Sequence, residues 1–251
     1  MNMAVPARRR ASREAEHPSA HLQLLGGFEL VCDGEAASLP LGAQRLIAFL
    51  AIRRQRLLRA HVAGALWLEL PDSRAGANLR SSLWRLNCMD RHLVEASPTS
   101  LRLSDSVSVD LWEAERSAYH VLRGDARTED VDDLEVRVLV LDHELLPDWY
   151  EEWMVYEQQR FHQLRLHALE TLCLRLTAAR RFAQAIDAGQ RAVAAEPLRE
   201  TAHRALILAH LEEGNRSEAV KHYRRFAERL HDELGCHPSE SMERLVAPLA
   251  M

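Results

Sequence analysis

The sequence predicts a mainly α-helical protein in which an N-terminal α+β domain precedes an all-α domain. Apolar residues alternate along residues 22–40, as in short strands, whereas the chain beyond about residue 105 is nearly all helical in its periodicity. The charge changes sign near the same point. Residues 1–104 hold 14 Arg against 9 Asp and Glu, and the remainder holds 18 Arg and Lys against 28 Asp and Glu. This contrast indicates two domains with different partners, and the basic half is the candidate for nucleic acid.

Composition narrows the class of protein and its compartment. The hydrophobic content of 47% and the charged content of 27% are typical of a globular protein. No apolar run reaches the ~18 residues of a membrane span, and the N-terminus lacks the apolar core of a secretory signal. The four cysteines lie far apart without a CxxC pair, as expected for reduced thiols. We therefore expect a cytoplasmic protein.

The sequence offers little for catalysis or for a bound cofactor. No HExxH motif and no zinc-like spacing occurs among the 13 histidines. Nothing around Lys221, the single lysine, resembles a GxxxxGK[ST] phosphate loop, and the GxSxG and GxGxxG motifs are absent. We expect no metal, no cofactor and no enzymatic activity, which favours a binding function.

The N-terminal region divides into a tail and a small sheet. Residues 1–20 are rich in Ala, Arg and Ser without periodicity, which predicts a disordered tail. Its triplet Arg8–Arg10 could follow DNA as an arm or simply be solvated. Strands are predicted within residues 22–40, where Asp33-Gly34 supplies a two-residue hairpin turn. A third strand is expected near Ala36–Leu39.

Three helices and a hairpin follow this sheet. Helical spacing of apolar residues predicts helices over Ala43–Arg54, Ala60–Leu68 and Arg74–Asp90. Leu93–Glu95 and Leu101–Leu103 flank a Ser-Pro-Thr-Ser turn and are interpreted as a closing hairpin. The order of sheet, three helices and hairpin predicts a winged helix–turn–helix over residues 21–104. In such a fold the third helix enters the major groove, and the hairpin, or wing, touches the DNA backbone or the minor groove.

The third predicted helix has an apolar face and a polar face. At about 100° per residue, a stripe that we expect to pack on the first two helices contains Ala75, Leu79, Leu83 and Leu86. The opposite face and its edge hold Ala77, Asn78, Arg80, Ser81, Trp84 and Arg85. Arg, Asn and Ser side chains match the hydrogen-bonding groups of base edges. The alternative is the solvated face of an ordinary amphipathic helix, but an exposed Trp84 favours a partner.

Other arginines are candidates for phosphate contacts, which position a protein on DNA without reading its sequence. The end of the first predicted helix and the following turn hold Arg53, Arg54, Arg56 and Arg59. These residues equally fit the alternative of cations placed favourably near a helix C-terminus. Arg102 lies on the predicted wing, where it could reach a phosphate or be a plain exposed strand residue. The predicted DNA-binding residues are Asn78, Arg80, Ser81, Trp84, Arg85, Arg53, Arg54, Arg56 and Arg102.

The acidic half carries a repeat of 34 residues, the period of tetratricopeptide units. The shift maps Ala185 onto Ala219, and also Ala168 onto Ala202 and Leu172 onto Leu206. This predicts an all-α, tetratricopeptide-like domain over residues 105–251, whose earlier helices lie within 110–122, 131–146 and 149–176. Trp149, Trp153 and Tyr156 are spaced to share a helix face, either in the core or in a ligand groove. An acidic surface that could meet basic partners is predicted from Glu151, Glu152, Glu157, Glu212 and Glu213.

These segments resemble a known family of regulators. The stretch LLGGFELVCDGEAASLPLGAQRLIAFLAI resembles the OmpR-type DNA-binding domain of the Streptomyces antibiotic regulatory proteins (SARPs). The stretches EPLRETAHRALILAHLEEGNRSEAVKHYRRF and LHDELGCHPSE resemble the bacterial transcriptional activation domain of the same family. The resemblance covers roughly residues 22–247.

The resemblance implies a promoter-specific transcription activator. Family members bind direct repeats near the −35 element, often as head-to-tail pairs, and recruit RNA polymerase through its sigma factor and α subunit. They typically switch on biosynthetic gene clusters. The resemblance also implies a homodimer on double-stranded DNA that is associated with the nucleoid. Asn87-Cys88 and the Ser97–Ser100 turn depart from the family pattern in the recognition helix and the wing, which leaves the operator sequence open.

Two other functions remain open from the residues alone. One is a tetratricopeptide-like scaffold for protein interactions, and the other is a ligand-responsive repressor. A scaffold would not need the Arg80, Ser81 and Arg85 cluster opposite the leucine stripe, so this cluster favours DNA binding.

Overall fold

The computed structural model describes residues 20–89, 92–123 and 142–247. The chain divides into two compact units. The first contains Phe28–Val109 together with the residues up to Gln23, and the second contains Leu24–Gly27 together with the residues from Asp110 onward. The predicted disordered tail, apart from Ala20, and most of the helix predicted at residues 131–146 lie outside the described residues.

The first unit begins with a four-stranded sheet in the order β3-β2-β1-β7. Its strands are β1 (Ala20–Gln23), β2 (Glu29–Cys32), β3 (Glu35–Ala36) and β7 (Val107–Val109). β1 is antiparallel to β2 and parallel to β7. The predicted turn at Asp33-Gly34 is present, with positive φ angles of 48° and 85°. The expected third strand is present, but it is shorter than Ala36–Leu39 and begins one residue earlier, because β3 pairs with β2 through Glu35 and Ala36.

The three predicted helices are α1 (Leu41–Arg53), α2 (Arg59–Leu66) and α3 (Asp72–Asn87). Every residue of α1 from Leu46 to Ile52 is buried, because this helix is apolar on all sides and lies inside the core. A second sheet has the order β4-β6-β5. It contains β4 (Leu57–Leu58), β5 (Val94–Ala96) and β6 (Ser100–Leu103). The winged helix–turn–helix predicted from the order of elements is therefore confirmed.

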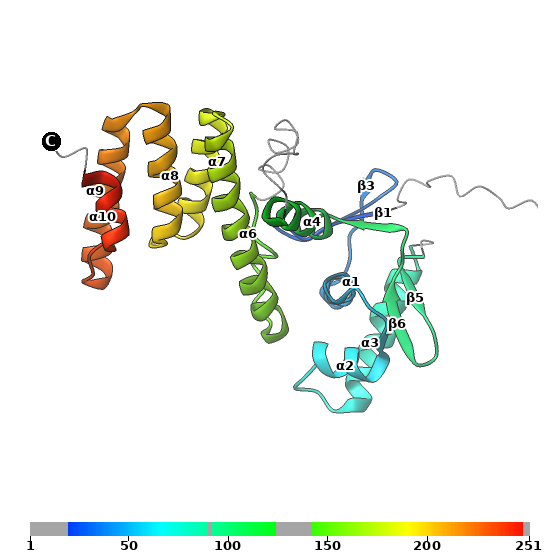
Figure 1. The fold of residues 1–251 in the computed structure, drawn as a ribbon. Helices are drawn as coiled ribbons and strands as arrows, with labels where there is room; N and C mark the ends of the chain where they lie inside the picture. Colours follow the sequence, from blue (N-terminus) through cyan, green and yellow to red (C-terminus); the bar gives the residue numbers. More distant parts are fainter. Residues whose placement is uncertain (1–19, 90–91, 124–141, 248–251) are drawn as a thin grey trace, which may run out of the picture. The chain divides into compact units, whose positions relative to one another are not determined.

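The described part of the second unit is mainly helical (Figure 1). Its helices are α4 (Asp110–Arg123), α6 (Glu152–Ala178), α7 (Phe182–Ala195), α8 (Glu200–Glu213), α9 (Arg216–Leu234) and α10 (Glu240–Val246). Each helix from α6 to α9 packs on the next one along the chain. The residue pairs of the 34-residue shift occupy equivalent buried positions, as Leu172 in α6 and Leu206 in α8 illustrate. This arrangement confirms the predicted tetratricopeptide-like class.

The aromatic residues around the start of α6 do not form the predicted shared face. α6 begins at Glu152, so Trp149 precedes the helix and packs edge-on against Trp153, with ring centroids 6.4 Å apart. Tyr156 is 67% exposed rather than part of the core. The i, i+4, i+7 argument fails here because it assumed that the helix already included Trp149.

One residue of the predicted acidic surface is buried. Glu157 on α6 accepts a hydrogen bond from Arg160 at 3.0 Å, and Arg160 also donates to Glu115 of α4 at 2.5 Å. Both carboxylates are nearly inaccessible. A buried carboxylate is costly without a cation, so Arg160 links α4 to α6 and Glu157 does not contribute to the surface charge.

Asp110, the first residue of α4, fixes the segment Leu24–Gly27 within the second unit. Its carboxylate accepts the backbone N–H groups of Leu24 and Leu25 at 2.9 Å, and that of Leu111 at 2.6 Å. Leu25 also forms a β-bridge with Leu145, and both leucines at 24 and 25 are buried. A carboxylate at a helix N-terminus is favoured by the helix dipole, and here it also satisfies two buried donors outside the helix.

A histidine pair joins α8 to α9. His203 Nε2 lies 2.9 Å from the carbonyl oxygen of Pro197, which can only accept, so Nε2 donates. The other ring nitrogen, Nδ1, then accepts from His222 Nε2 at 2.9 Å. The His203 ring also stacks on Phe226 with centroids 4.1 Å apart. Burial lowers the pKa of both histidines, that of His222 to about 4, where His210 and Arg225 add to the repulsion by His203.

We predict that Asp110→Ala lowers the free energy of unfolding of the second unit by roughly 2–4 kcal/mol, because buried backbone donors lose a charged acceptor. Urea denaturation followed by circular dichroism at 222 nm measures this change. The matched control is Asp187→Ala, which removes an exposed carboxylate paired with Arg191 and should cost less than about 1 kcal/mol. Equal midpoints for the two variants would contradict the role assigned to Asp110.

We predict that the protein loses stability as the pH falls from about 6.5 toward 4. The unfolded chain binds protons at His222 and His203 near the ordinary pKa of 6.5, whereas the folded chain binds them only at lower pH. Protonation therefore favours the unfolded state in this window and lowers the free energy of unfolding by roughly 2–3 kcal/mol. Urea midpoints measured in half-unit pH steps should show a shallower decline for His222→Gln than for the exposed control His92→Gln. Parallel declines would refute the assignment.

Candidate nucleic-acid interface

The apolar stripe of α3 holds this helix against α1 and α2. The four predicted residues are all buried, namely Ala75, Leu79, Leu83 and Leu86. Ser82 is buried beside them, and a Cβ at Gly42 of α1 would lie only 3.0 Å from its Oγ. The absence of a side chain at Gly42 therefore allows α1 to approach α3 closely. This packing fixes which face of α3 points outward.

The outward face of α3 carries the five residues predicted to read bases. All of them are exposed, namely Asn78, Arg80, Ser81, Trp84 and Arg85. Trp84 is 58% exposed, and the guanidinium carbon of Arg85 lies 4.9 Å from the centroid of its ring. Among the residues that the structure describes, Arg80 and Arg85 form no ion pair. Their positive charges are thus not compensated by any carboxylate of the described residues.

Arg53 and Arg54 lie where α1 ends. Arg53 is in the last turn, half-buried, with its guanidinium carbon 5.4 Å from the centroid of the Phe49 ring. Arg54 follows as the C-cap, in the left-handed conformation with a φ angle of 53°. Both positions fit the alternative of cations that stabilise the helix C-terminus, so the geometry does not single them out as phosphate contacts.

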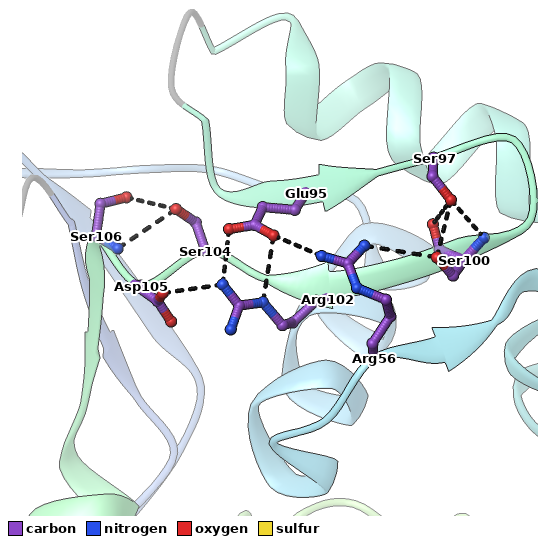
Figure 2. A network of polar contacts seen from close by, with 8 residues as sticks. All are labelled: Arg56, Glu95, Ser97, Ser100, Arg102, Ser104, Asp105 and Ser106. Carbon is purple, nitrogen blue, oxygen red and sulfur yellow. Dashed lines mark hydrogen bonds and ion pairs between the residues drawn. The ribbon is translucent and has the colours of Figure 1, made fainter.

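Arg56 and Arg102 are tied to Glu95, as Figure 2 shows. Arg102 on β6 donates two hydrogen bonds to the Glu95 carboxylate, at 3.2 and 2.8 Å, and a third to Asp105 at 2.9 Å. Arg56 donates to Glu95 at 2.9 Å from the loop before β4. The bonds from Arg102 and the charges of both arginines lower the pKa of Glu95. The sequence offered both arginines as candidate phosphate contacts, with the alternatives of a cation near a helix C-terminus for Arg56 and a plain exposed strand residue for Arg102. The partner Glu95 was not foreseen.

The pairing of Glu95 with Arg102 had a signal in the sequence. The two residues face each other in the β5–β6 register, because the hairpin closes through Ser97 and Ser100. The Ser97 hydroxyl accepts the Ser100 backbone N–H at 3.0 Å and stabilises the turn. Counting back from the predicted Ser-Pro-Thr-Ser turn would have placed the opposite charges side by side.

Arg59, the first residue of α2, attaches the wing to the helices. Its Nε donates to the Ser97 carbonyl oxygen at 2.8 Å, and its backbone N–H donates to the Thr99 carbonyl oxygen at 2.9 Å. The guanidinium that the sequence offered as a further phosphate contact therefore has a structural role at the wing turn.

The described residues offer neither a metal site nor a membrane span. Within residues 20–89, 92–123 and 142–247, no three His, Cys, Asp or Glu side chains are grouped so that they could hold a metal ion. None of the helices in these ranges is both long enough and apolar enough to cross a bilayer. The surface chemistry that the described residues do offer is the uncompensated positive charge of α3.

Comparison with known proteins adds three findings. The family model described as bacterial transcriptional activator domain matches residues 109–249. Regulatory protein AfsR of Streptomyces coelicolor is 30% identical over 252 residues, which cover 96% of this chain and 25% of AfsR. The solved structure of Mycobacterium tuberculosis EmbR in complex with a low affinity phosphopeptide is similar with a TM-score of 0.72 and 22% identity. It covers 92% of this chain and 65% of the EmbR chain, so the chain spans only part of both relatives.

We predict that Trp84→Ala changes the free energy of unfolding by less than about 0.5 kcal/mol, as expected for an exposed residue without a structural role. The neighbouring control Leu83→Ala removes a buried side chain of the stripe and should cost roughly 2–5 kcal/mol. Thermal and urea denaturation of both variants measure the difference. A large loss of stability in the Trp84 variant would show that this face is built for packing rather than for a partner.

Proposed function

The chain belongs to the family of bacterial transcriptional activator domain proteins, as a SARP-type regulator, and we propose that it activates transcription by binding specific promoter DNA and recruiting RNA polymerase. We assign DNA binding to residues 21–104 and activation to residues 105–251. The family consists of transcriptional regulators rather than enzymes, and we expect no enzymatic activity from this chain.

The outward face of α3 is the observation that carries this proposal. Arg80 and Arg85 present guanidinium groups that no carboxylate of the described residues neutralises, and Asn78 and Ser81 are exposed on the same helix. These side chains match the acceptors and donors of base edges in the major groove. Trp84 offers a large exposed ring beside them, which can pack against a sugar or the backbone.

The family resemblance supports the finer parts of the proposal. We propose that two copies bind direct repeats near the −35 element and contact the sigma factor and α subunit of polymerase. The regulated genes then belong to a biosynthetic cluster, and the protein acts in the cytoplasm at the nucleoid. The acidic composition of residues 105–251 supports this division of labour, because like charge disfavours a second DNA contact there.

The proposal is tested by binding of the purified chain to promoter fragments from its own genomic neighbourhood, against a shuffled competitor, at two salt concentrations. Tight binding to one fragment that weakens with added salt supports a sequence-specific regulator. Equal or absent binding to all fragments contradicts it and favours the tetratricopeptide-like scaffold. Addition of polymerase with transcription from the bound fragment then separates an activator from a repressor.

On the bound fragment, we predict that Arg85→Ala weakens affinity by about 1–3 kcal/mol, because a good base contact is lost. The matched control Arg204→Ala removes the same charge from an exposed position of α8 and should change affinity little. Fluorescence anisotropy titrations with the specific and shuffled fragments measure both. Identical affinities for the Arg85 variant and the wild-type protein would remove Arg85 from the reading face.

A further inference from the structure

We propose that Glu95 is a specificity-determining residue that withholds Arg56 and Arg102 from DNA phosphates. This inference rests on the proposed function, because it concerns how the first unit distinguishes its operator from other DNA. We call Arg56, Glu95, Arg102 and Asp105 the wing network. Glu95 belongs to β5 and Arg102 to β6, whereas Arg56 precedes β4 and Asp105 follows β6. Figure 2 shows the four side chains converging.

The wing network carries two positive and two negative charges, so it is neutral as a whole. Arg102 directs Nε and one terminal nitrogen at carboxylates, which leaves only its other terminal nitrogen without such a bond. Arg56 donates a hydrogen bond from one terminal nitrogen to Glu95, and its other terminal nitrogen lies 3.5 Å from the Ser100 hydroxyl oxygen. Glu95 is the shared acceptor, so its charge decides whether both guanidiniums are compensated.

The exposure of these side chains argues against a purely structural explanation. The side chains of Arg56, Glu95 and Arg102 are 50%, 41% and 34% exposed, and that of Asp105 is 84% exposed. Ion pairs so accessible to water contribute little to folding stability. Glu95 can therefore be replaced without unfolding the sheet, whose apolar residues Leu101 and Leu103 remain buried.

The consequence for DNA binding follows from the electrostatics of phosphates. Each phosphate that a protein neutralises releases counterions and steepens the salt dependence of binding by about 0.9 in the log–log slope. An arginine already compensated by a carboxylate neutralises little, and a carboxylate itself repels phosphates within the screening distance of about 10 Å at 0.1 M salt. A neutral wing network therefore keeps the affinity for arbitrary sequences low.

The position of the network makes this effect relevant to the reading face. β5 packs against α3, and the wing turn is held to the start of α2 by Arg59. In a winged helix–turn–helix the third helix enters the major groove and the wing touches the DNA backbone or the minor groove. On the proposed function, the phosphates therefore approach the hairpin that carries Glu95 and Arg102. Base contacts by Arg80 and Arg85 do not depend on Glu95, so a lower background affinity raises the ratio of specific to non-specific binding.

The test compares the full chain with its E95Q variant, which keeps the side-chain shape and removes the charge. Anisotropy titrations use the bound promoter fragment and a shuffled duplex of equal length, from 50 to 300 mM KCl. For the shuffled duplex we expect E95Q to bind about 3- to 10-fold more tightly at low salt, with a slope steeper by roughly 1–2. The promoter fragment should gain less, so the specificity ratio falls.

Two controls separate release of the arginines from a general change in charge. E29Q removes an equal charge from an exposed position of β2 outside the network and should leave the slope nearly unchanged. Adding R56Q and R102Q to E95Q should abolish its gain. The same two substitutions in the wild-type background should weaken binding to both duplexes, because Glu95 and Asp105 then lack their cations and repel phosphates. Thermal denaturation by circular dichroism confirms that each variant is folded.

The outcomes distinguish the inference from the function on which it rests. A wild-type protein that binds no DNA at low salt overturns the proposed function and this inference with it. A wild-type protein that binds its promoter, with an E95Q variant indistinguishable from E29Q or weaker than wild type, overturns only the role of Glu95. A gain in E95Q that persists without Arg56 and Arg102 also overturns it, because the released charges would then not be those of the network.

Discussion

Asp110 lies where β7 has ended and α4 begins, and its carboxylate accepts the backbone N–H groups of Leu24 and Leu25. These donors are buried and belong to a segment that has left β1 and not yet entered β2. Unpaired backbone donors in such a place would be costly. A single carboxylate therefore allows a chain that starts in the first unit to place four residues in the second and return. The parallel pairing of β1 with β7 on one side of this excursion depends on the same arrangement.

Two groups of arginines in the first unit differ in their electrostatic surroundings, and net charge does not distinguish them. Those on α3 project from a helix whose other face is packed, and they have no carboxylate partner among the described residues. Those at positions 56 and 102 face Glu95 across a hairpin and are compensated. The formal charge of the basic half thus overstates the positive charge offered to DNA by this surface. Among the described residues, the arginines without a carboxylate partner include Arg80 and Arg85 on α3, the helix for which we propose base contacts.

Periodicity in the sequence was sufficient for the helices and for the buried stripe of α3, because each helix repeats its own signal over several turns. It was insufficient for β4 and β7, which are two and three residues long and exist through partners far along the chain, as Leu57 pairs with Leu101. The exposure of the outward face of α3 was predictable from the position of the buried stripe on the opposite face. The pairing of Arg56 and Arg102 with Glu95 was not predictable in this way. It requires the β5–β6 register and the loop before β4 to bring both arginines to the same carboxylate. The role of Asp110 could not be predicted either, because its partners Leu24 and Leu25 lie 86 and 85 positions away in the sequence.

The path of Leu24–Gly27 has a consequence for how such proteins can be divided. The chain passes between its two units at three peptide bonds rather than one, after Gln23, Gly27 and Val109. A cut after Val109 would leave the N-terminal fragment with two leucines deprived of their cover. It would also leave the C-terminal fragment without Leu25, which bridges to Leu145. Recombination that exchanges one unit for that of another protein must therefore also preserve the contacts of Leu24–Gly27 with the second unit. This requirement favours inheritance of the two units together.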